Sequence, residues 1–232
     1  MFCLHCIKII MTINIAHTPL AEDEITIKTI EKAIYEAKIT AIVAYEHGEI
    51  NIVVSEPCFT LPLLTILKTH EELKFKMLID ICGADYLTGK AGKGIYTKSQ
   101  HNIAPDKRFE VVYHLLSFKL NKRVRLKVCL NYLQKAQSIT ALFSAACWFE
   151  RETFDMYGIE FENAEDLRRI LTDYNFEGFP LRKDFPLTGF KQIRYDKTLG
   201  KIVEEPVNLQ QEYRNFDFES PWKGAVYSIK NQ

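Results

Sequence analysis

The chain has 232 residues, which is enough for one domain with extensions or for two small domains. Its 30 basic and 30 acidic side chains balance, which argues against binding to nucleic acid or to an acidic membrane surface. No apolar run reaches the roughly 18 to 20 residues that a membrane-spanning helix needs. We therefore expect any contact with a membrane to go through other proteins.

The first 20 residues are expected to be a variable leader. They begin with the apolar stretch MFCLHCIKII, which lacks the basic start and the cleavage site of a signal peptide. Met11 is an alternative start of the chain. Cys3 and Cys6 form a CxxC pair, but a zinc or iron–sulfur site needs further ligands at suitable spacing, and no second pair exists. We therefore expect reduced thiols and no metal.

The part of the chain up to residue 81 predicts two helices, a hairpin and a strand. Apolar residues at helical spacing indicate helices over residues 26–37 and 61–72. Between them, the β-rich residues 39–45 and 50–54 flank the turn sequence EHGE, which predicts a hairpin. A strand is expected over residues 75–81.

The next part predicts a loop, two strands and a helix. Residues 87–107 contain three glycines and four lysines, which is typical of an exposed loop. Residues 109–118 and 123–130 are expected to be strands, and the second alternates between apolar and mostly basic residues, as a half-buried antiparallel strand does. Ser138 is expected to cap a helix that runs to about Tyr157.

These elements predict an α+β fold, in which a mostly antiparallel sheet carries helices on one face and an extended C-terminal arm follows. The expected divisions are a leader over residues 1–20, an α+β sandwich domain over residues 21–157, and an arm with a tail over residues 158–232. Residues 192–195 and 201–205 flank a turn within this arm and predict a second hairpin.

The first part of the arm combines chain breakers with large apolar side chains. Glycine and proline residues exclude a regular element over residues 175–190. The apolar side chains are more numerous than a disordered linker normally carries. They are Phe176, Phe179, Leu181, Phe185 and Leu187. We expect the arm to bury them on its own domain or on another chain.

The stretch from Trp148 to Phe190 resembles the signature of the C-subunit family of NADH-quinone oxidoreductase, which is the 30-kDa subunit family of respiratory complex I. The tail around residues 209–222 is also similar to this family. Departures from the usual pattern stand at Ala164-Glu165, Asn175 and Phe179, where the family commonly has His-Pro, Gly and His. The matching runs are Glu150-Arg151-Glu152, Phe154-Asp155, Gly158-Ile159, Phe161, residues 166–173 (DLRRILTD), Gly178, residues 180–187 (PLRKDFPL) and Gly189.

The resemblance implies a non-catalytic subunit in the peripheral arm of the proton-translocating NADH:quinone oxidoreductase (NDH-1, complex I). That enzyme moves electrons from NADH through FMN and iron–sulfur clusters to quinone, and its cofactors belong to partner subunits. This chain would scaffold the 49-kDa-type (D) subunit, which forms much of the quinone pocket, and would also neighbour the B and I subunits. It would lie on the cytoplasmic face of a bacterial inner membrane, equivalent to the mitochondrial matrix face, without activity of its own.

Two alternatives to this interpretation stay open. One is a homologous scaffold subunit of a membrane-bound hydrogenase or formate-oxidising complex. The other is a free-standing enzyme that uses Glu150, Glu152 and Asp155 in acid/base catalysis. Since no pocket partner can be named for these carboxylates, the sequence favours surface or interface ion pairs.

The basic residues of the arm favour binding to protein rather than to nucleotide. Neither a GxGxxG nor a GxxxxGK[ST] motif is present to cradle a phosphate. Arginines near aspartates more often clamp carboxylates across an interface. We expect no catalytic, cofactor-binding or metal-binding residue. The expected subunit-interface residues are Glu150, Arg151, Glu152, Asp155, Gly158, Arg168, Arg169, Asp173, Gly178, Pro180, Arg182, Lys183, Asp184, Phe185, Pro186 and Trp222.

Overall fold

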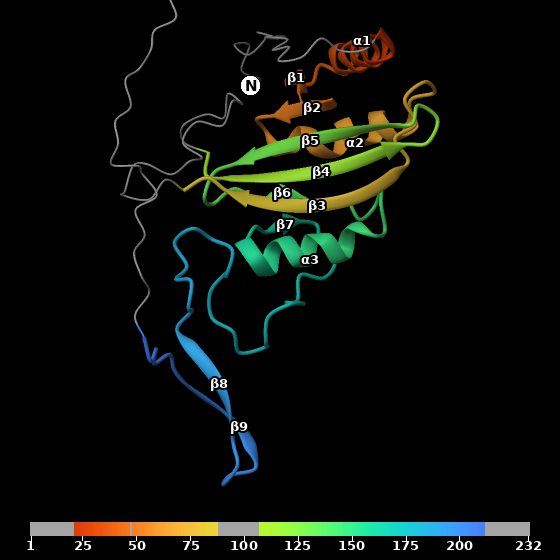
Figure 1. Ribbon diagram of the computed structural model, residues 1–232. Coiled ribbons are helices and arrows are strands. Elements are labelled where there is room, and N and C mark those ends of the chain that lie inside the picture. The colour runs from red at the N-terminus through yellow and green to blue at the C-terminus, as the bar shows by residue number, and fades with distance from the viewer. Residues whose placement is uncertain (1–20, 47, 88–106, 212–232) are drawn as a thin grey trace, which may run out of the picture. The chain divides into compact units, whose positions relative to one another are not determined.

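The computed structural model describes residues 21–46, 48–87 and 107–211 (Figure 1). The predicted leader with Cys3 and Cys6, nearly all of the predicted loop after residue 87, and the tail with Trp222 lie outside the described residues. The chain forms two compact units, of which the first ends at Leu187 and the second begins at Thr188. The predicted domain boundaries themselves stay predictions.

A five-stranded sheet forms the centre of the first unit. Its strand order is β1-β2-β5-β4-β3, and every neighbouring pair is antiparallel except β2 and β5, which are parallel. This arrangement confirms the predicted mostly antiparallel sheet, including the hairpin of its first two strands. The strands are β1 (Ala41–Glu46), β2 (Glu49–Val54), β3 (Met77–Asp85), β4 (Phe109–Ser117) and β5 (Lys122–Leu130).

Alternation along the strands decides which face of the sheet is apolar. In β5, Val124, Leu126 and Val128 are buried, whereas Arg123 lies at an alternate position, points to the opposite face and is exposed. Tyr113 of β4 pairs with Leu126 in the ladder and is fully buried on the same apolar face. Because side chains alternate, a slip of one residue would turn this whole apolar set away from the core.

Three helices pack on this apolar face. They are α1 (Ala21–Glu36), α2 (Thr60–Thr69), which follows a short 3-10 turn (Pro57–Phe59), and α3 (Ala146–Tyr157). Buried side chains of all three helices join the sheet residues in one hydrophobic cluster. The α+β class with helices on one face is therefore confirmed. Within the described residues, no helix is long and apolar enough to cross a membrane.

The predicted helix from Ser138 to Tyr157 is wrong in its first part, because α3 begins only at Ala146. The amide of Ser138 donates to the carbonyl of Glu162 at 3.0 Å, which continues the short parallel pairing of β6 (Ala136–Gln137) with β7 (Phe161–Glu162). Ile139 and Phe143 are still buried, but through turns. Tertiary contacts override the helical spacing here.

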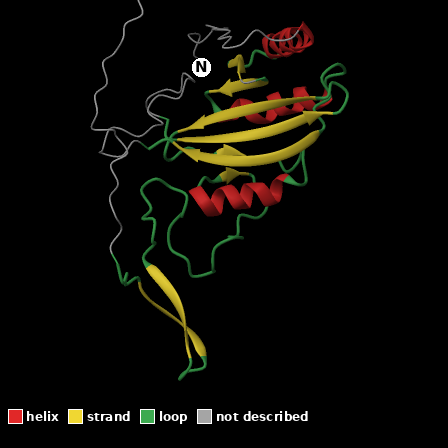
Figure 2. Ribbon diagram, viewed as in Figure 1, coloured by secondary structure: helices red, strands yellow, loops and turns green. Residues whose placement is uncertain are grey.

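The chain after α3 is mostly irregular. Apart from β7, residues 158–187 contain turns, bends and loops (Figure 2). This agrees with the prediction that residues 175–190 form no regular element. In the second unit, β8 (Lys191–Asp196) and β9 (Lys201–Pro206) form an antiparallel hairpin, which confirms the second predicted hairpin.

Candidate functional site

The candidate site is the signature segment, by which we mean residues 148–187. It begins on α3, which ends at Gly158 with a φ of 70°. A Cβ atom at this position would lie 2.4 Å from Nη2 of Arg182 and 2.6 Å from Cε2 of Phe179. Glycine is therefore needed at this position for two reasons. It ends α3 in the left-handed conformation, and its lack of a Cβ atom lets the following chain fold back against the helix.

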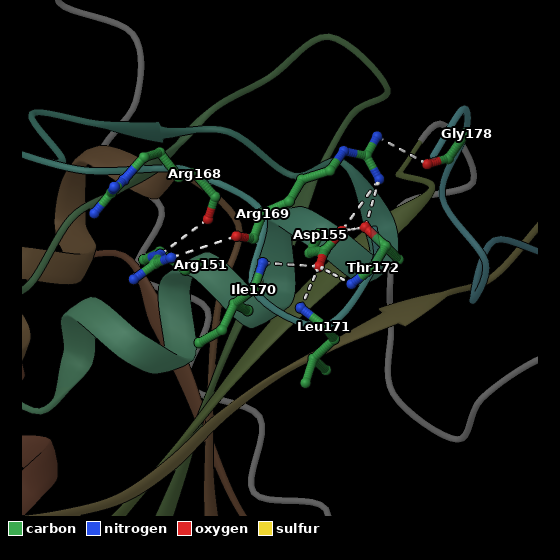
Figure 3. Close-up of polar contacts among 8 residues, drawn as sticks. All are labelled: Arg151, Asp155, Arg168, Arg169, Ile170, Leu171, Thr172 and Gly178. Atoms are coloured by element: carbon green, nitrogen blue, oxygen red, sulfur yellow. Dashed lines mark hydrogen bonds and ion pairs between the residues drawn. The ribbon is translucent and has the colours of Figure 1, made fainter. Parts of the chain in front are cut away.

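Asp155 lies on the last turn of α3 and is fully buried. Its Oδ2 accepts hydrogen bonds from three consecutive backbone amides, those of Ile170 (3.0 Å), Leu171 (2.7 Å) and Thr172 (2.9 Å), as Figure 3 shows. Its Oδ1 accepts from the hydroxyl of Thr172 at 2.6 Å and from Nη1 of Arg169 at 3.1 Å. One carboxylate thus fixes the conformation of a turn that lies about fifteen residues further along the chain.

The electrostatics of Asp155 follow from these contacts. Burial alone would raise the pKa of its carboxyl group, but the hydrogen bonds from Thr172, Leu171 and Ile170 favour the ionised form more strongly. The net result is a pKa below the ordinary value of 3.8. Asp155 is therefore a buried carboxylate that stays charged, and its oxygens are occupied by donors of its own chain.

Arg169 extends this network to the next turn. Besides Asp155, it donates from Nη1 to the hydroxyl of Thr172 at 3.2 Å and from Nη2 to the carbonyl of Gly178 at 3.0 Å. Its guanidinium also lies 5.1 Å from the ring centroid of Phe179. Arg169 thereby joins the two halves of the irregular segment to α3.

Arg151 holds the same segment from one turn earlier on α3. Its Nε donates to the carbonyl of Arg168 at 2.9 Å, and its Nη2 donates to the carbonyl of Arg169 at 3.4 Å (Figure 3). The guanidinium lies 5.1 Å from the ring centroid of Trp148. These contacts position the backbone that leads into the Asp155 turn.

Arg182 fastens the end of the segment to the end of α3. It donates from Nε to the carbonyl of Tyr157 and lies 4.3 Å from the ring centroid of Phe179. Further rings surround it, since the centroids of Phe109 and Tyr132 lie at 5.3 Å and 5.6 Å. Such stacking uses the planar guanidinium, which lysine could not replace.

A second buried carboxylate, Asp85 at the end of β3, binds the neighbouring residues. It accepts from Nε of Arg108 at 3.0 Å and from the amide of Lys183 at 2.9 Å, and Arg108 also pairs with Asp184 at 3.0 Å. Burial raises the pKa of Asp85, but the bonds from Arg108 and Lys183 outweigh this and lower it. The sheet and the signature segment are thus joined across 98 residues of sequence.

Glu150 is a third buried carboxyl group, and the expectation that it forms a surface or interface ion pair is wrong. It is only 1% exposed, and it accepts from the hydroxyl of Ser138 and from the amide of Ile139, both at 2.8 Å. Burial raises its pKa, and these two hydrogen bonds oppose that shift only in part. Asp155 is also buried, but it does form an ion pair, with Arg169 at 3.1 Å, and Glu152 is exposed.

The predicted interface residues therefore occupy different environments. Asp155, Arg169 and Arg182 bind within the chain, and Phe185 packs on Phe176 with ring centroids 5.8 Å apart. Asp173 is exposed, and Pro180 and Pro186 are partly buried. The interface role of the whole set stays a prediction. Sequence reasoning missed three of the residues that hold the segment, namely Asp85, Arg108 and Thr172.

Several large side chains are exposed on the turns that Asp155, Arg169 and Arg182 hold in place. Tyr174 is 100% exposed, Leu187 is 89% exposed, and Leu171 and Leu181 are at least half exposed. The side chain of Arg168 is exposed beside them in sequence and pairs with Asp166 at 2.9 Å. We call Arg168, Leu171, Tyr174, Leu181 and Leu187 the outward set.

This arrangement is suited to holding a shape rather than to acid/base chemistry. A general base needs a free oxygen within reach of a substrate proton, and the oxygens of Asp85, Glu150 and Asp155 already accept hydrogen bonds from their own chain. No cluster of three His, Cys, Asp or Glu side chains that could hold a metal occurs among the described residues. The absence of a metal from the whole chain stays a prediction.

Comparisons with known proteins agree with the resemblance seen in the sequence. The family model of the 30-kDa subunit of respiratory-chain NADH dehydrogenase matches residues 53–191. The NADH-quinone oxidoreductase C subunit of Rickettsia bellii is 50% identical over 174 residues, covering 75% of this chain and 81% of the relative. The C subunit of Mesorhizobium japonicum is 49% identical over 183 residues, covering 79% and 83%.

A solved structure supports the same fold at greater distance. A chain of the membrane-bound sulfane sulfur reductase (MBS), an archaeal respiratory membrane complex, matches with a TM-score of 0.53 at 20% identity. The match covers 69% of this chain and 85% of that chain, and it concerns the fold alone. The family match and the identity to curated relatives lead to one conclusion: this chain belongs to the 30-kDa subunit family of the respiratory-chain NADH dehydrogenase.

Proposed function

We propose that this chain is a peripheral-arm subunit of the proton-translocating NADH:quinone oxidoreductase, complex I, and that it scaffolds the subunit that forms the quinone pocket. In this role it binds the 49-kDa-type (D) subunit and lies near the B and I subunits. It carries no FMN or iron–sulfur cluster, and it has no activity in isolation. Its place is the cytoplasmic face of a bacterial inner membrane, or the equivalent matrix face in mitochondria.

One observation carries the scaffolding role: the part of the signature segment that follows α3 is irregular, yet many hydrogen bonds fix its backbone. Asp155, Arg169 and Arg182 hold it to α3, and Asp85 holds it to the sheet. An irregular segment without such contacts would fluctuate among many conformations, and binding would then have to order it. Preformed turns present their exposed side chains to a partner at lower entropic cost.

The outward set is the part of this segment that we assign to direct contact with the partner. Exposed aromatic and leucine side chains on a shaped surface resemble the anchors of protein interfaces, and Arg168 adds a charge at their edge. The buried members of the predicted interface, such as Asp155 and Arg169, act through the shape that they impose. The residues of the predicted interface thus divide into those that contact the partner directly and those that shape the surface.

Copurification tests the proposal. The chain carries an affinity tag on its chromosomal copy, and the native complex is purified in mild detergent and identified by mass spectrometry. We expect the FMN-carrying and quinone-site subunits of NADH:quinone oxidoreductase in stoichiometric amounts. A complex with hydrogenase or formate-oxidising subunits instead would support the alternative scaffold. A monomeric chain with enzymatic activity of its own would refute both.

A further inference from the structure

Glu150 lies in the first half of α3 and is buried among neutral partners. It is 1% exposed, and its carboxyl group contacts only the hydroxyl of Ser138 and the amide of Ile139. No Lys, Arg or His side chain of the described residues forms an ion pair with it. Because an unpaired charge is costly to bury, such an environment favours the neutral carboxylic acid.

The two partners of Glu150 fit a neutral acid well. A carboxylic acid needs a donor for its carbonyl oxygen and an acceptor for its O–H group. The amide of Ile139 can only donate, and it lies 2.8 Å from Oε1. The hydroxyl of Ser138 can donate or accept, and it lies 2.8 Å from Oε2. A proton on Oε2 therefore finds an acceptor in Ser138, and the ionised form finds a donor in the same hydroxyl.

The hydroxyl of Ser138 leads onward to the surface. Its Oγ lies 3.0 Å from Oγ1 of Thr140, and either oxygen can be the donor. Ser138 is 8% exposed, whereas Thr140 is partly exposed. The oxygens of Glu150, Ser138 and Thr140 thus form a continuous hydrogen-bonded row from the buried carboxyl group to solvent. We call the hydroxyls of Ser138 and Thr140 the hydroxyl relay.

The other titratable groups around this site lie outside the row. Tyr113 of β4 is fully buried, and burial together with the charge of Glu150 raises the pKa of its phenol. Its hydroxyl has no hydrogen-bond partner among the described residues. Lys68 of α2 donates to the carbonyl of Leu142, and Arg151 of α3 binds backbone carbonyls of the signature segment. Neither cation is a counter-ion of Glu150.

We propose that Glu150 is a proton-binding site and that the hydroxyl relay exchanges its proton with solvent. When the proton is released, Oε2 of Glu150 gives it to Oγ of Ser138. Ser138 passes its own proton to Oγ1 of Thr140, and Thr140 passes its own to water. Both hydroxyls are neutral before and after, so the products are one carboxylate and one hydrated proton. Uptake follows the same path in reverse.

NMR of the full chain tests the proton-binding site. The side-chain carboxyl carbons of glutamate are isotopically labelled, and the signal of Glu150 is identified by its loss in Glu150→Gln. The chemical shift of this carbon reports the protonation of the carboxyl group and is followed against pH. Because burial raises the pKa of Glu150, we expect a midpoint above the ordinary value of 4.5. A midpoint at or below 4.5 would refute the site.

Two substitutions of Thr140 test the relay. Valine keeps the β-branched shape but lacks the hydroxyl, whereas serine keeps the hydroxyl. At the midpoint of the titration, relaxation dispersion of the Glu150 signal gives the rate of proton exchange. We expect Thr140→Val to lower this rate at least about tenfold, because the row loses an oxygen, and Thr140→Ser to keep it within about twofold. Equal rates in these two variants would show that the proton does not pass through Thr140.

Tyr113→Phe is the control for exchange by general opening of the core. It removes a buried hydroxyl outside the row and should leave the exchange rate unchanged. If it lowers the rate as much as Thr140→Val does, the relay is refuted. These measurements use the full chain without its complex. Their outcome is therefore independent of the proposed function, which is tested by copurification.

Discussion

At the scale of single residues, two buried carboxyl groups on one helix have opposite electrostatic roles. Asp155 is held ionised by backbone amides, a hydroxyl and Arg169, so its pKa is lowered despite burial. Glu150, less than two turns earlier, accepts only two hydrogen bonds from neutral donors, so burial raises its pKa. The difference lies in the number and the charge of the donors, since both groups are almost fully removed from water.

Replacement of Asp155 by asparagine is expected to destabilise the chain by about 3 kcal/mol at neutral pH, because several donors then lose a charged acceptor. Since the folded pKa is below the unfolded one, this contribution is present above the unfolded pKa of about 3.9 and is lost as the pH falls through the folded pKa. Urea unfolding between pH 3 and pH 7 measures the free energy of unfolding of both chains. The difference between the variant and the unmodified chain should become smaller at acid pH. The same change at the exposed Asp173 is the control, and an equal effect there would contradict the account.

Replacement of Glu150 by glutamine should show the opposite dependence on pH. A raised folded pKa favours the protonated form, so the stabilisation is present below the unfolded pKa and is lost as the pH rises through the folded pKa. Glutamine is neutral at every pH, and its amide can donate to the hydroxyl of Ser138 while its oxygen accepts from Ile139. Relative to the unmodified chain, Glu150→Gln should therefore become more stable from pH 4 toward pH 7. A loss of stability like that of Asp155→Asn would show that Glu150 is needed as an anion.

At the scale of elements, the regular parts could be predicted and the contacts of the irregular part could not. Apolar alternation predicts β5 and the hairpin of β8 and β9, because alternation with a period of two residues is typical of a half-buried strand. The missed start of α3 and the buried Glu150 share one cause, since the turns before α3 depend on Ser138 meeting a carboxylate twelve residues away. The bond from Lys183 to Asp85 likewise joins residues whose partnership no local pattern reveals.

Gly158 offers a test at this scale. Alanine at this position must adopt a left-handed backbone conformation and also places a Cβ atom against Arg182 and Phe179. Gly48, in the turn between β1 and β2, has a φ of 80° but nothing within 4 Å of an added Cβ. Both substitutions carry the conformational cost of about 1 kcal/mol. In thermal unfolding, we expect Gly158→Ala to lower the free energy of unfolding by at least about 2 kcal/mol more than Gly48→Ala does. Equal costs would mean that the packing of Arg182 on the helix end is not important.

At the scale of the whole molecule, membership of the 30-kDa subunit family is consistent with a chain whose buried polar groups shape a surface. The signature runs seen in sequence include both the residues that fix the turns and the side chains that the turns expose. Leu171 shows both aspects, since its amide binds Asp155 and its side chain is 60% exposed. This explains how one signature stretch can combine residues that fix a turn with side chains that the turn exposes.

The most direct test of this account measures assembly and turnover separately for one pair of variants. Leu171→Ser with Tyr174→Ser removes two anchors of the outward set, and Ile25→Ser with Tyr35→Ser removes similarly exposed side chains from α1 as the control. Native gels measure the amount of complex, and NADH:quinone activity is normalised to FMN content. We predict at least about tenfold less assembled complex for the first pair, with turnover per FMN unchanged, and no effect for the control. Normal assembly with turnover reduced about a hundredfold would contradict the account, because it would place these residues in the reaction itself.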